Sequence, residues 1–297
     1  ISWNRIPADS RRISVERQIA VIGGGAAGMM AAVQAARAGA QVTVYERNDR
    51  IGKKILSTGN GKCNFSNEKM DASCYHGSGR KLLPAVYDIF GVPETRMFFQ
   101  DLGMRIKSVN GYLYPASGQA STVLDLFRYE LKRLSVDIHT GQQITNIELP
   151  TNSKKGFRVR AGKPDSMNSV YDSVILTCGG AAAPCTGSDG SGWQLARQLG
   201  HRIVPVVPAL TALRCKETYF KQVAGVRCDA QITLYVNGTQ VCHEEGELQL
   251  TDYGISGIPV FQISRHAAYA LREKKHTSVE ISFLPQDDDC AYEGFWR

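Results

Sequence analysis

The residues best suited to hold a charged ligand lie in one loop, KKILSTGNGKCNFSN, at positions 53–67. The loop begins with Lys53 and Lys54, continues with glycines, asparagines and Cys63, and contains no acidic residue. Lysine ammonium groups neutralise phosphate, and glycines let backbone amides approach a ligand closely. The loop therefore predicts a site for a small anion.

Most of the excess positive charge of the chain lies around this loop. The formal net charge of the 297 residues is +7, and positions 47–81 carry eight Lys or Arg against three Asp or Glu, a local balance of +5. A basic cluster beside glycines favours a bound small anion over a nucleic-acid-binding face, which stays open as the alternative.

A second group of glycines lies in a βαβ pattern at residues 18–46. Gly23, Gly25 and Gly28 form G-x-G-x-x-G between an apolar β-rich run and a helix-forming stretch. In this motif the first glycine permits the tight turn, the second lets the backbone approach a pyrophosphate, and the third lets helix and strand pack closely. Glu46 closes the second strand, where a carboxylate accepts hydrogen bonds from ribose hydroxyls. The pattern predicts an α/β, Rossmann-type fold that binds a dinucleotide.

The sequence divides into a tail and two expected domains. Residues 1–17 have no clear period and predict a flexible tail, and residues 18–200 predict the dinucleotide-binding domain. Residues 201–297 predict a second, strand-rich domain with a hairpin turn at Asn237-Gly238.

Three shorter segments complete the first domain. A helix is expected from a cap at Ser121 or Thr122, and it would bury one face made of Leu124, Phe127, Leu131 and Leu134. The segment 136–149 predicts two strands that pair with each other. The run SVILTCGG, at 173–180, predicts a buried strand whose glycines mark a second place where backbone approaches a ligand.

The eight cysteines favour neither a structural metal nor a disulfide framework. They are scattered, without a C-x-x-C pair or a zinc-type Cys/His spacing, and no charged and apolar leader opens the chain. This predicts reduced thiols in a cytoplasmic protein. Residues 19–36 are uncharged, but their glycines, alanines and β-branched start predict a strand, a turn and a helix rather than a membrane span.

Six stretches in chain order resemble a bacterial family of NAD(P)/FAD-dependent oxidoreductases of the BaiN or aminoacetone oxidase type. They are GGGAAG, IGKKILSTGNGKCNFSN, YPASGQASTVLD, ILTCGG, TGSDGSGWQLARQLGH and GELQLTDYGISG, within residues 18–285. The glycine motif by itself suits either NAD or FAD. The resemblance implies FAD held by a Rossmann-type domain into which a β-rich second domain is inserted, and a small-molecule substrate.

The resemblance also implies which residues contact FAD. The pyrophosphate would contact Gly23, Gly25, Ala27 and Gly28, and the ribose would contact Glu46. Lys53 and Lys54 would lie near the phosphates or the ribityl chain, and the residues close to the flavin ring would be Asn60, Gly61, Cys63 and Asn64. The backbone of Ile144 would contact the adenine, and the second strand end would contribute Cys178, Gly179 and Gly180. That strand end reads Thr-Cys-Gly-Gly where the family has Ala-Thr-Gly-Gly, so Cys178 replaces the family's hydroxyl.

No catalytic side chain is assigned, because hydride chemistry belongs to the flavin. Two electron sources stay open: NAD(P)H that visits the flavin transiently, or an organic substrate such as an amine, with reoxidation by oxygen. Cys63 suits a packing residue better than a redox thiol, because no second cysteine lies at a short spacing.

The family continues beyond the matched region with a helical domain and a glycine-rich return to the FAD domain. Because this sequence stops at Arg297, weak or incomplete FAD binding is expected. Two alternative functions remain. One is an inactive, truncated flavoprotein fragment, and the other is a nucleic-acid-associated flavoprotein like those that modify transfer RNA, with the basic cluster as its footprint.

Overall fold

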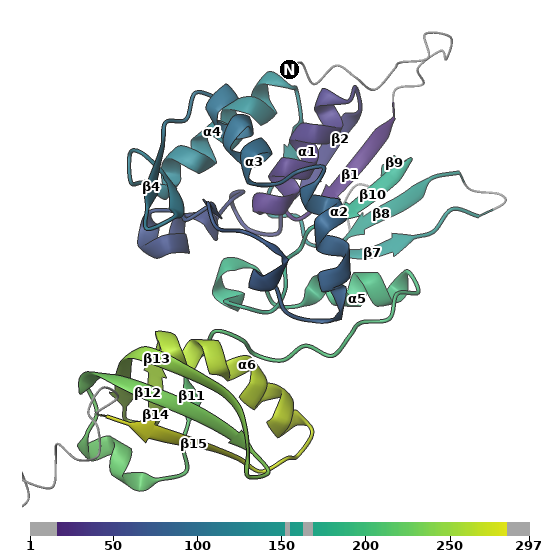
Figure 1. Ribbon diagram of the computed structural model, residues 1–297. Coiled ribbons are helices and arrows are strands. Elements are labelled where there is room, and N and C mark those ends of the chain that lie inside the picture. The colour runs from purple at the N-terminus through teal and green to yellow at the C-terminus, as the bar shows by residue number, and fades with distance from the viewer. Residues whose placement is uncertain (1–16, 152–154, 163–168, 284–297) are drawn as a thin grey trace, which may run out of the picture. The chain divides into compact units, whose positions relative to one another are not determined.

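The computed structural model describes residues 17–151, 155–162 and 169–283 (Figure 1). The chain forms two compact units, and the boundary between them falls between Ile203 and Val204. The expected N-terminal tail, residues 1–17, lies outside the described residues except for its last position.

A four-stranded parallel sheet in the order β10-β1-β2-β6 forms the centre of the first unit. Its strands are β1 (Gln18–Ile22), β2 (Gln41–Tyr45), β6 (Asp137–His139) and β10 (Ser173–Leu176). Helix α1 (Ala26–Arg37) connects β1 to β2, which confirms the βαβ unit expected from the sequence. Because β1 lies between β2 and β10, the segments that follow these three strands come together at the carboxyl edge of the sheet.

Both faces of this sheet are covered, which explains the continuous apolar run of β1. On one face, Val21 packs in a core with residues of α1 and α4 (Ala120–Arg133). On the other face, Ala20 and Ile22 pack in a second core with the antiparallel strands β7, β8 and β9. These strands span Ile144–Glu148, Phe157–Ala161 and Ser169–Tyr171.

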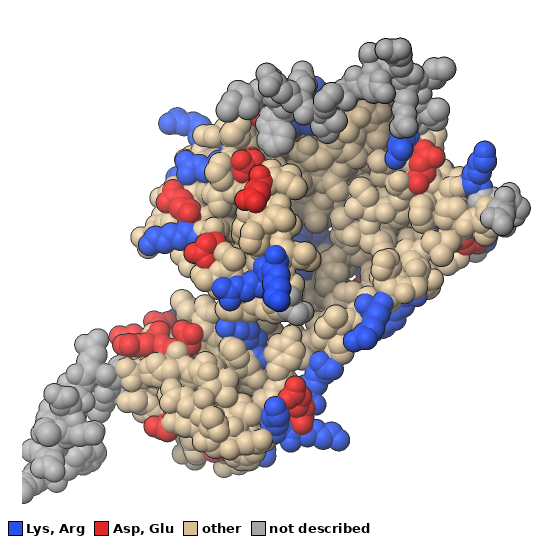
Figure 2. All heavy atoms as spheres, turned by 45° about the vertical axis from the view of Figure 1, so that its right-hand side comes forward, with Lys and Arg blue, Asp and Glu red and all other residues tan. Residues whose placement is uncertain are grey.

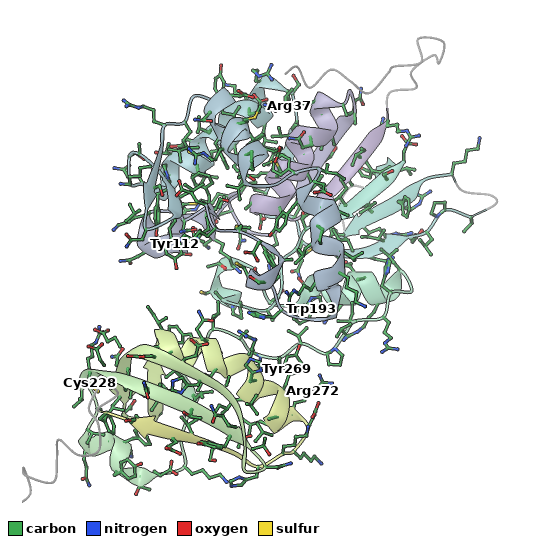
Figure 3. The ribbon with its side chains drawn as sticks, in the orientation of Figure 1. Arg37, Tyr112, Trp193, Cys228, Tyr269 and Arg272 are labelled. Carbon is green, nitrogen blue, oxygen red and sulfur yellow. The ribbon has the colours of Figure 1, made fainter. Side chains whose placement is uncertain are left out.

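A buried carboxylate joins the two helices on the first face. Glu130 of α4 forms salt bridges with Arg37, the last residue of α1, and with Arg133 of its own helix. Figure 3 labels Arg37. The contact of Arg37 with Glu130 joins the C-terminal end of α1 to α4.

The rest of the first unit consists of short elements. They are the 3₁₀ helices η1 (Ile55–Gly61), η2 (Ala72–Cys74), η3 (Ser78–Leu82) and η4 (Pro184–Thr186), the helices α2 (Leu83–Tyr87), α3 (Val92–Asp101) and α5 (Ser191–Gln198), and the strands β3 (Ser66–Asn67), β4 (Ile106–Val109) and β5 (Tyr112–Pro115). The last three form an antiparallel sheet in the order β3-β5-β4.

The second unit is an antiparallel sheet with one long helix. The sheet order is β11-β14-β13-β12-β15. Its strands are β11 (Leu213–Arg214), β12 (Arg227–Val236), β13 (Thr239–Thr251), β14 (Gly254–Gly257) and β15 (Thr277–Ser282), and a 3₁₀ helix, η5 (Thr218–Gln222), precedes β12. Residues of α6 (Ile258–Arg272), among them Ile263 and Ala267, pack in one core with Ile232 and Leu248 of the sheet. This confirms the additional antiparallel domain.

Local expectations had mixed outcomes. The hairpin turn is confirmed: Asn237 and Gly238, with φ of 51° and 78°, connect β12 to β13. The pairing expected within 136–149 is wrong, because β6 joins β2 in the parallel sheet whereas β7 pairs with β8. Both segments are strands, but the sequence does not reveal that their partners lie elsewhere in the chain.

The helix cap was also misplaced. Helix α4 begins at Ala120 after Gln119, so Ser121 and Thr122 lie in its first turn instead of capping it. Three residues of the expected apolar face, Leu124, Phe127 and Leu131, are buried, whereas Leu134 follows the end of the helix and is partly buried against the same core. Within the described ranges, no helix has both the length and the apolar character needed to cross a bilayer.

Candidate functional site

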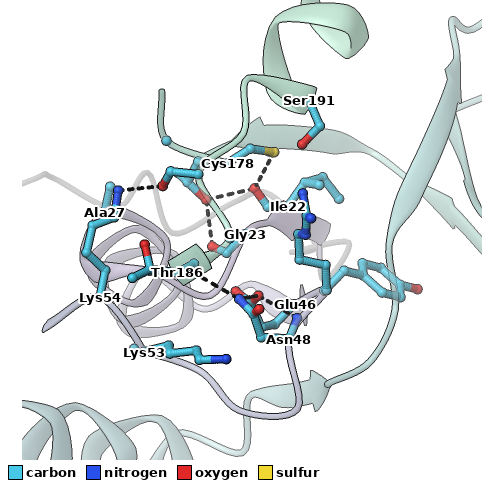
Figure 4. Close-up of a pocket in the computed structure, with 18 of the residues that line it drawn as sticks. Ile22, Gly23, Ala27, Glu46, Asn48, Lys53, Lys54, Cys178, Thr186 and Ser191 are labelled. Atoms are coloured by element: carbon cyan, nitrogen blue, oxygen red, sulfur yellow. Dashed lines mark hydrogen bonds between the residues drawn. The ribbon is translucent and has the colours of Figure 1, made fainter. Parts of the chain in front are cut away.

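A cavity of about 250 Å³ lies at the carboxyl edge of the parallel sheet, within the first unit (Figure 4). Four segments line it: the turn after β1, the segment after β2, residues 142–144 and the segment after β10. In open α/β sheets, ligands bind at this edge because strand ends and helix N-termini meet there. The fold therefore gives the cavity the position expected of a nucleotide site.

The glycine turn after β1 is built as the motif requires. Gly23 has a φ of +110°, and a Cβ there would lie 2.6 Å from the carbonyl oxygen of Thr177. A Cβ on Gly28 would lie 1.8 Å from the carbonyl oxygen of Gly23, so only glycine lets α1 pack this closely on the turn. The hydroxyl of Thr177 donates to the carbonyls of Ile22 and Gly23, at 3.0 and 2.8 Å, and ties the end of β10 to the same turn.

The N-terminus of α1 opens onto the cavity without a cap. Gly25 is the N-cap residue, no side chain bonds the helix end, and the first turn contains no acidic residue. A Cβ on Gly25 would meet no atom within 4 Å, so the backbone here faces open space, and Gly25, Ala26 and Ala27 all line the cavity. Free amide groups and the helix dipole make such an end a site for an anion.

Glu46, at the end of β2, is buried and held in place by three hydrogen bonds. Its Oε2 accepts from the amide of Gly24 at 2.8 Å. Its Oε1 accepts from the amide and the side-chain nitrogen of Asn48, at 2.8 and 2.7 Å. Oε2 retains one lone pair, so the fixed carboxylate can accept one further hydrogen bond from a ligand hydroxyl.

Positive charge exceeds negative charge around the cavity. Its charged lining residues are Arg47, Lys53 and Lys54 against Glu46. Arg47 forms an ion pair with Asp189 at 2.6 Å, and the Arg47 guanidinium lowers the pKa of the Asp189 carboxyl. Lys54 donates to the carbonyl of Ala182 and to the hydroxyl of Ser188, both at 2.7 Å, whereas Lys53 makes no hydrogen bond or ion pair with the part of the chain that the structure describes.

The strand end after β10 places a thiol at the cavity. The Sγ of Cys178 lies 3.3 Å from the carbonyl oxygen of Ile22 and donates to it, and burial raises the pKa of this thiol. A Cβ on Gly192 would lie 2.7 Å from the Cβ of Cys178, so α5 packs closely against the same strand end. Cys178 is therefore a neutral packing group in the wall of the cavity.

Nine of the fifteen residues expected at FAD line this cavity, namely Gly23, Gly25, Ala27, Glu46, Lys53, Lys54, Ile144, Cys178 and Gly179. Gly28, Asn60, Gly61, Cys63, Asn64 and Gly180 do not line it. Gly28 acts through packing, as described above. The expected position of Asn60, Gly61, Cys63 and Asn64 beside a flavin ring stays a prediction.

The loop that holds these four residues has an unusual backbone. Asn60 and Cys63 have positive φ, 53° and 55°, beside Gly59 and Gly61, which also have positive φ. Cys63 is buried, and burial raises the pKa of its thiol. A redox role would need a thiolate, so the structure favours the packing interpretation of Cys63.

Several lining residues were missed by the sequence reasoning, above all Asn48, Thr177 and Ser188. Asn48 lies two residues after Glu46, the acid expected to contact the ribose. At this spacing an Asn side chain can turn back and donate a hydrogen bond to the Glu46 carboxylate. Thr177 lies in the stretch ILTCGG and Ser188 in the stretch TGSDGSGWQLARQLGH, both of which resemble the family. No pattern within these stretches shows that the two residues contact residues 22–54.

Comparison with known proteins gives related sequences. Residues 17–272 match the family model described as the HI0933-like protein Rossmann domain. The sequence is 49% identical over 271 residues to the 3-dehydro-bile acid delta(4,6)-reductase of Clostridium scindens, which covers 91% of this chain and 65% of that protein. It is 27% identical over 270 residues to the ribosomal RNA dihydrouridine synthase of Haemophilus influenzae, which covers 89% of this chain and 64% of that protein. The chain thus spans somewhat less than two thirds of the length of these relatives.

Among solved structures, the 3-ketosteroid-delta4-(5alpha)-dehydrogenase from Rhodococcus jostii RHA1, in complex with 4-androstene-3,17-dione, is similar with a TM-score of 0.50. The two chains are 16% identical, and the match covers 75% of this chain and 61% of that one. This likeness concerns the fold.

Proposed function

Because the chain belongs to the HI0933-like Rossmann family, we propose that it is an FAD-dependent oxidoreductase that binds the diphosphate of FAD at the N-terminus of α1. The family match and the 49% identical reductase confirm the resemblance drawn from the sequence motifs. One observation carries the proposal: an uncapped helix N-terminus, beside a glycine with open space in front of it, lines a cavity whose cations outnumber its acids.

The residues present fit FAD. The amides of Gly25, Ala26 and Ala27 would hold the diphosphate, and Lys53 would supply charge to it. The free lone pair of Glu46 Oε2 would accept a hydrogen bond from a ribose hydroxyl. Backbone groups near Ile144, which lines the cavity, would face the adenine.

The bound flavin would supply the hydride chemistry, and the chain would supply orientation and exclusion of water. For the substrate class, we propose a carbon–carbon double bond conjugated to a carbonyl. This feature is common to a 3-dehydro-delta(4,6) steroid skeleton and to the pyrimidine ring of uridine, the compounds that the names of the two relatives specify. NAD(P)H is the proposed electron donor, and an amine with reoxidation by oxygen is the rival.

Titration of the purified protein with FAD tests the binding. We expect the flavin fluorescence to change until it saturates at one FAD per chain, and we expect ADP to compete because it contains the adenosine and diphosphate groups alone. Absence of saturable binding would contradict the proposal and would favour the alternative of an inactive fragment. With FAD bound, anaerobic bleaching by NADH or NADPH, but not by amines, would support the proposed donor.

A nucleic-acid substrate is the second candidate function. Its support is the 27% identical relative, whose name specifies ribosomal RNA, and the exposure of Lys62, Arg80 and Lys81. On the face that Figure 2 shows, however, basic side chains occur at several separate places with acidic side chains between some of them. RNA binding that falls steeply with salt and is lost when Lys62, Arg80 and Lys81 become alanine would favour this candidate. Reduction of a free steroid enone, without RNA, would favour the first.

A further inference from the structure

Side chains that follow β2 hold the segment that follows β10, residues 182–189. Arg47 pairs with Asp189 at 2.6 Å, and the side-chain nitrogen of Asn48 donates to the carbonyl of Thr186 at 3.3 Å. The ammonium group of Lys54 bonds this segment at both ends, through the carbonyl of Ala182 and the hydroxyl of Ser188.

The segment needs such support because its own bonds are local. The amide of Thr186 donates to Ala183 and that of Gly187 donates to Pro184, so each bond spans three residues. Just outside the segment, the amide of Gly190 donates to the carbonyl of Gly180 at 3.0 Å. Ala183 and Gly187 have positive φ, at 58° and 100°, so the segment is a tight turn and not an extension of the sheet. Nothing in these internal bonds determines where the turn lies relative to the cavity.

The position of the turn matters because it forms one wall of the cavity. Thr186, Gly187 and Ser188 line the cavity, as do residues of the glycine turn after β1. Ser188 is only 8% exposed, and a Cβ on Gly179 would lie 2.8 Å from its hydroxyl. Lys54 therefore bonds a segment that forms part of the cavity wall.

The two adjacent lysines therefore differ in what they contact. Two of the three N–H donors of Lys54 are directed at protein oxygens 2.7 Å away. Lys53 lines the same cavity and has no such partner within the described residues. In Figure 4 the two side chains run in different directions.

We propose that Lys54 is a positioning residue, which holds residues 182–189 as a wall of the cavity and so sets how slowly a bound dinucleotide leaves, while Lys53 supplies the charge that attracts its phosphates. The resemblance implied one role for both lysines, near the phosphates or the ribityl chain, and the contacts favour two roles. The choice of FAD as the dinucleotide rests on the proposed function, but the restraint on the wall does not.

Hydrogen–deuterium exchange of the protein without added FAD tests the restraint. In Lys54→Met, we expect the amides of Thr186, Gly187 and Gly190 to exchange on the order of 10-fold faster, because two charge-assisted hydrogen bonds that hold the segment are lost. Lys53→Met is the matched control, and it should exchange like the wild type. Unchanged exchange in Lys54→Met would overturn the proposal.

Rapid-mixing kinetics with FAD tests the consequence. Lys54→Met should raise the dissociation rate constant on the order of 10-fold with little change in the association rate constant, since affinity lost through local contacts appears mainly in dissociation. Lys53→Met should instead lower the association rate constant and weaken its dependence on salt. If Lys54→Met behaves like Lys53→Met, both lysines are phosphate ligands and the proposal is wrong.

Ser188→Ala is a second variant that tests the role of Lys54 if Lys54→Met does not fold. It removes one of the two acceptors, so it should raise the dissociation rate constant by less than Lys54→Met does. The double variant should dissociate no faster than Lys54→Met alone, whereas additive effects would show that the two residues act separately. If the wild type binds no FAD, the proposed function fails, and the exchange experiment still decides the role of Lys54.

Discussion

The Oε2 atom of Glu46 accepts a hydrogen bond from the amide of Gly24 at 2.8 Å, which ties the end of β2 to the glycine turn after β1. The other oxygen, Oε1, bonds the backbone and side chain of Asn48. A carboxylate at this place thus does two things: it holds the shape of the turn that leads into α1, and it leaves a lone pair for a ligand.

Glu46→Gln should weaken both stability and FAD binding. The amide NH₂ of glutamine cannot accept a hydrogen bond, so either Gly24 or Asn48 loses its partner in a buried place, at a cost of about 1–3 kcal/mol in the free energy of unfolding. FAD affinity should fall on the order of 10-fold, the equivalent of one hydrogen bond. Asp49→Asn removes the same charge from a nearby exposed position and serves as the control. Equal affinities for FAD in the two variants would contradict a ribose contact at Glu46.

Replacing two glycines of the motif, Gly25 and Gly28, by alanine should have different effects: the first should weaken FAD binding and the second should lower stability. At Gly25 the backbone is extended and a Cβ meets nothing within 4 Å, so Gly25→Ala should fold with an unchanged melting temperature. Its methyl group would enter the cavity, and FAD affinity should fall on the order of 10-fold or more, because the backbone can no longer approach the diphosphate.

Gly28→Ala should show the reverse pattern. A Cβ there lies 1.8 Å from the carbonyl oxygen of Gly23, so α1 must move away from β1. We expect a loss of about 1–3 kcal/mol in the free energy of unfolding, as for other overpacked sites, or failure to fold. Thermal melts and FAD titrations of both variants check the pair. A destabilised Gly25→Ala, or a fully stable Gly28→Ala, would contradict the packing described for this turn.

Patterns among residues close in the sequence predicted part of this architecture. They did not predict which strands pair when those strands are far apart in the sequence. The βαβ unit follows from the periods of residues 18–46, and the hairpin follows from Asn237-Gly238, because both depend on neighbours in sequence. The parallel pairing of β1 with β10 joins residues more than 150 positions apart, and that pairing brings Thr177 to Gly23. The same limit explains the missed partners of β6 and of Lys54, whereas the partner of β7 is β8, the next strand along the chain.

The reactivity of the thiols should follow burial and not proximity to lysine. Burial raises the pKa of Cys63 and of Cys178, so at neutral pH both are thiols that react slowly, even though Lys62 is adjacent to Cys63. Cys74 and Cys185 are exposed. A thiol reagent followed by peptide mass spectrometry should label the exposed pair on the order of 100-fold faster. In the double variant Cys74→Ser, Cys185→Ser, the labelling of Cys63 and Cys178 should stay slow. Rapid labelling of Cys63 would revive the redox interpretation.

The ion pair between α1 and α4 should make stability depend on pH. Hydrogen bonds from Arg133 and then from Arg37, at 2.7–2.9 Å, lower the pKa of Glu130 to about 2. A carboxyl with a lowered pKa stabilises the fold above its unfolded pKa, which is about 4.5, and this contribution is lost as the pH falls toward 2. The shift corresponds to about 3 kcal/mol at neutral pH, since Glu130 is almost fully buried.

Denaturant unfolding of the wild type and of Glu130→Gln, from pH 7 to pH 3, measures this contribution. The variant should be less stable by about 2–4 kcal/mol at pH 7. The difference between the two proteins should shrink as the pH falls below about 4.5, because the carboxyl of the unfolded wild type gains a proton while the folded one stays ionised. Asp125→Asn, on the same helix, removes an ion pair with Arg128 in which the acid is 65% exposed. It should change stability by less than about 0.5 kcal/mol at any pH, since solvent screens the pair. If the difference between wild type and Glu130→Gln is the same at pH 3 as at pH 7, then Glu130 contributes through packing and not through its charge.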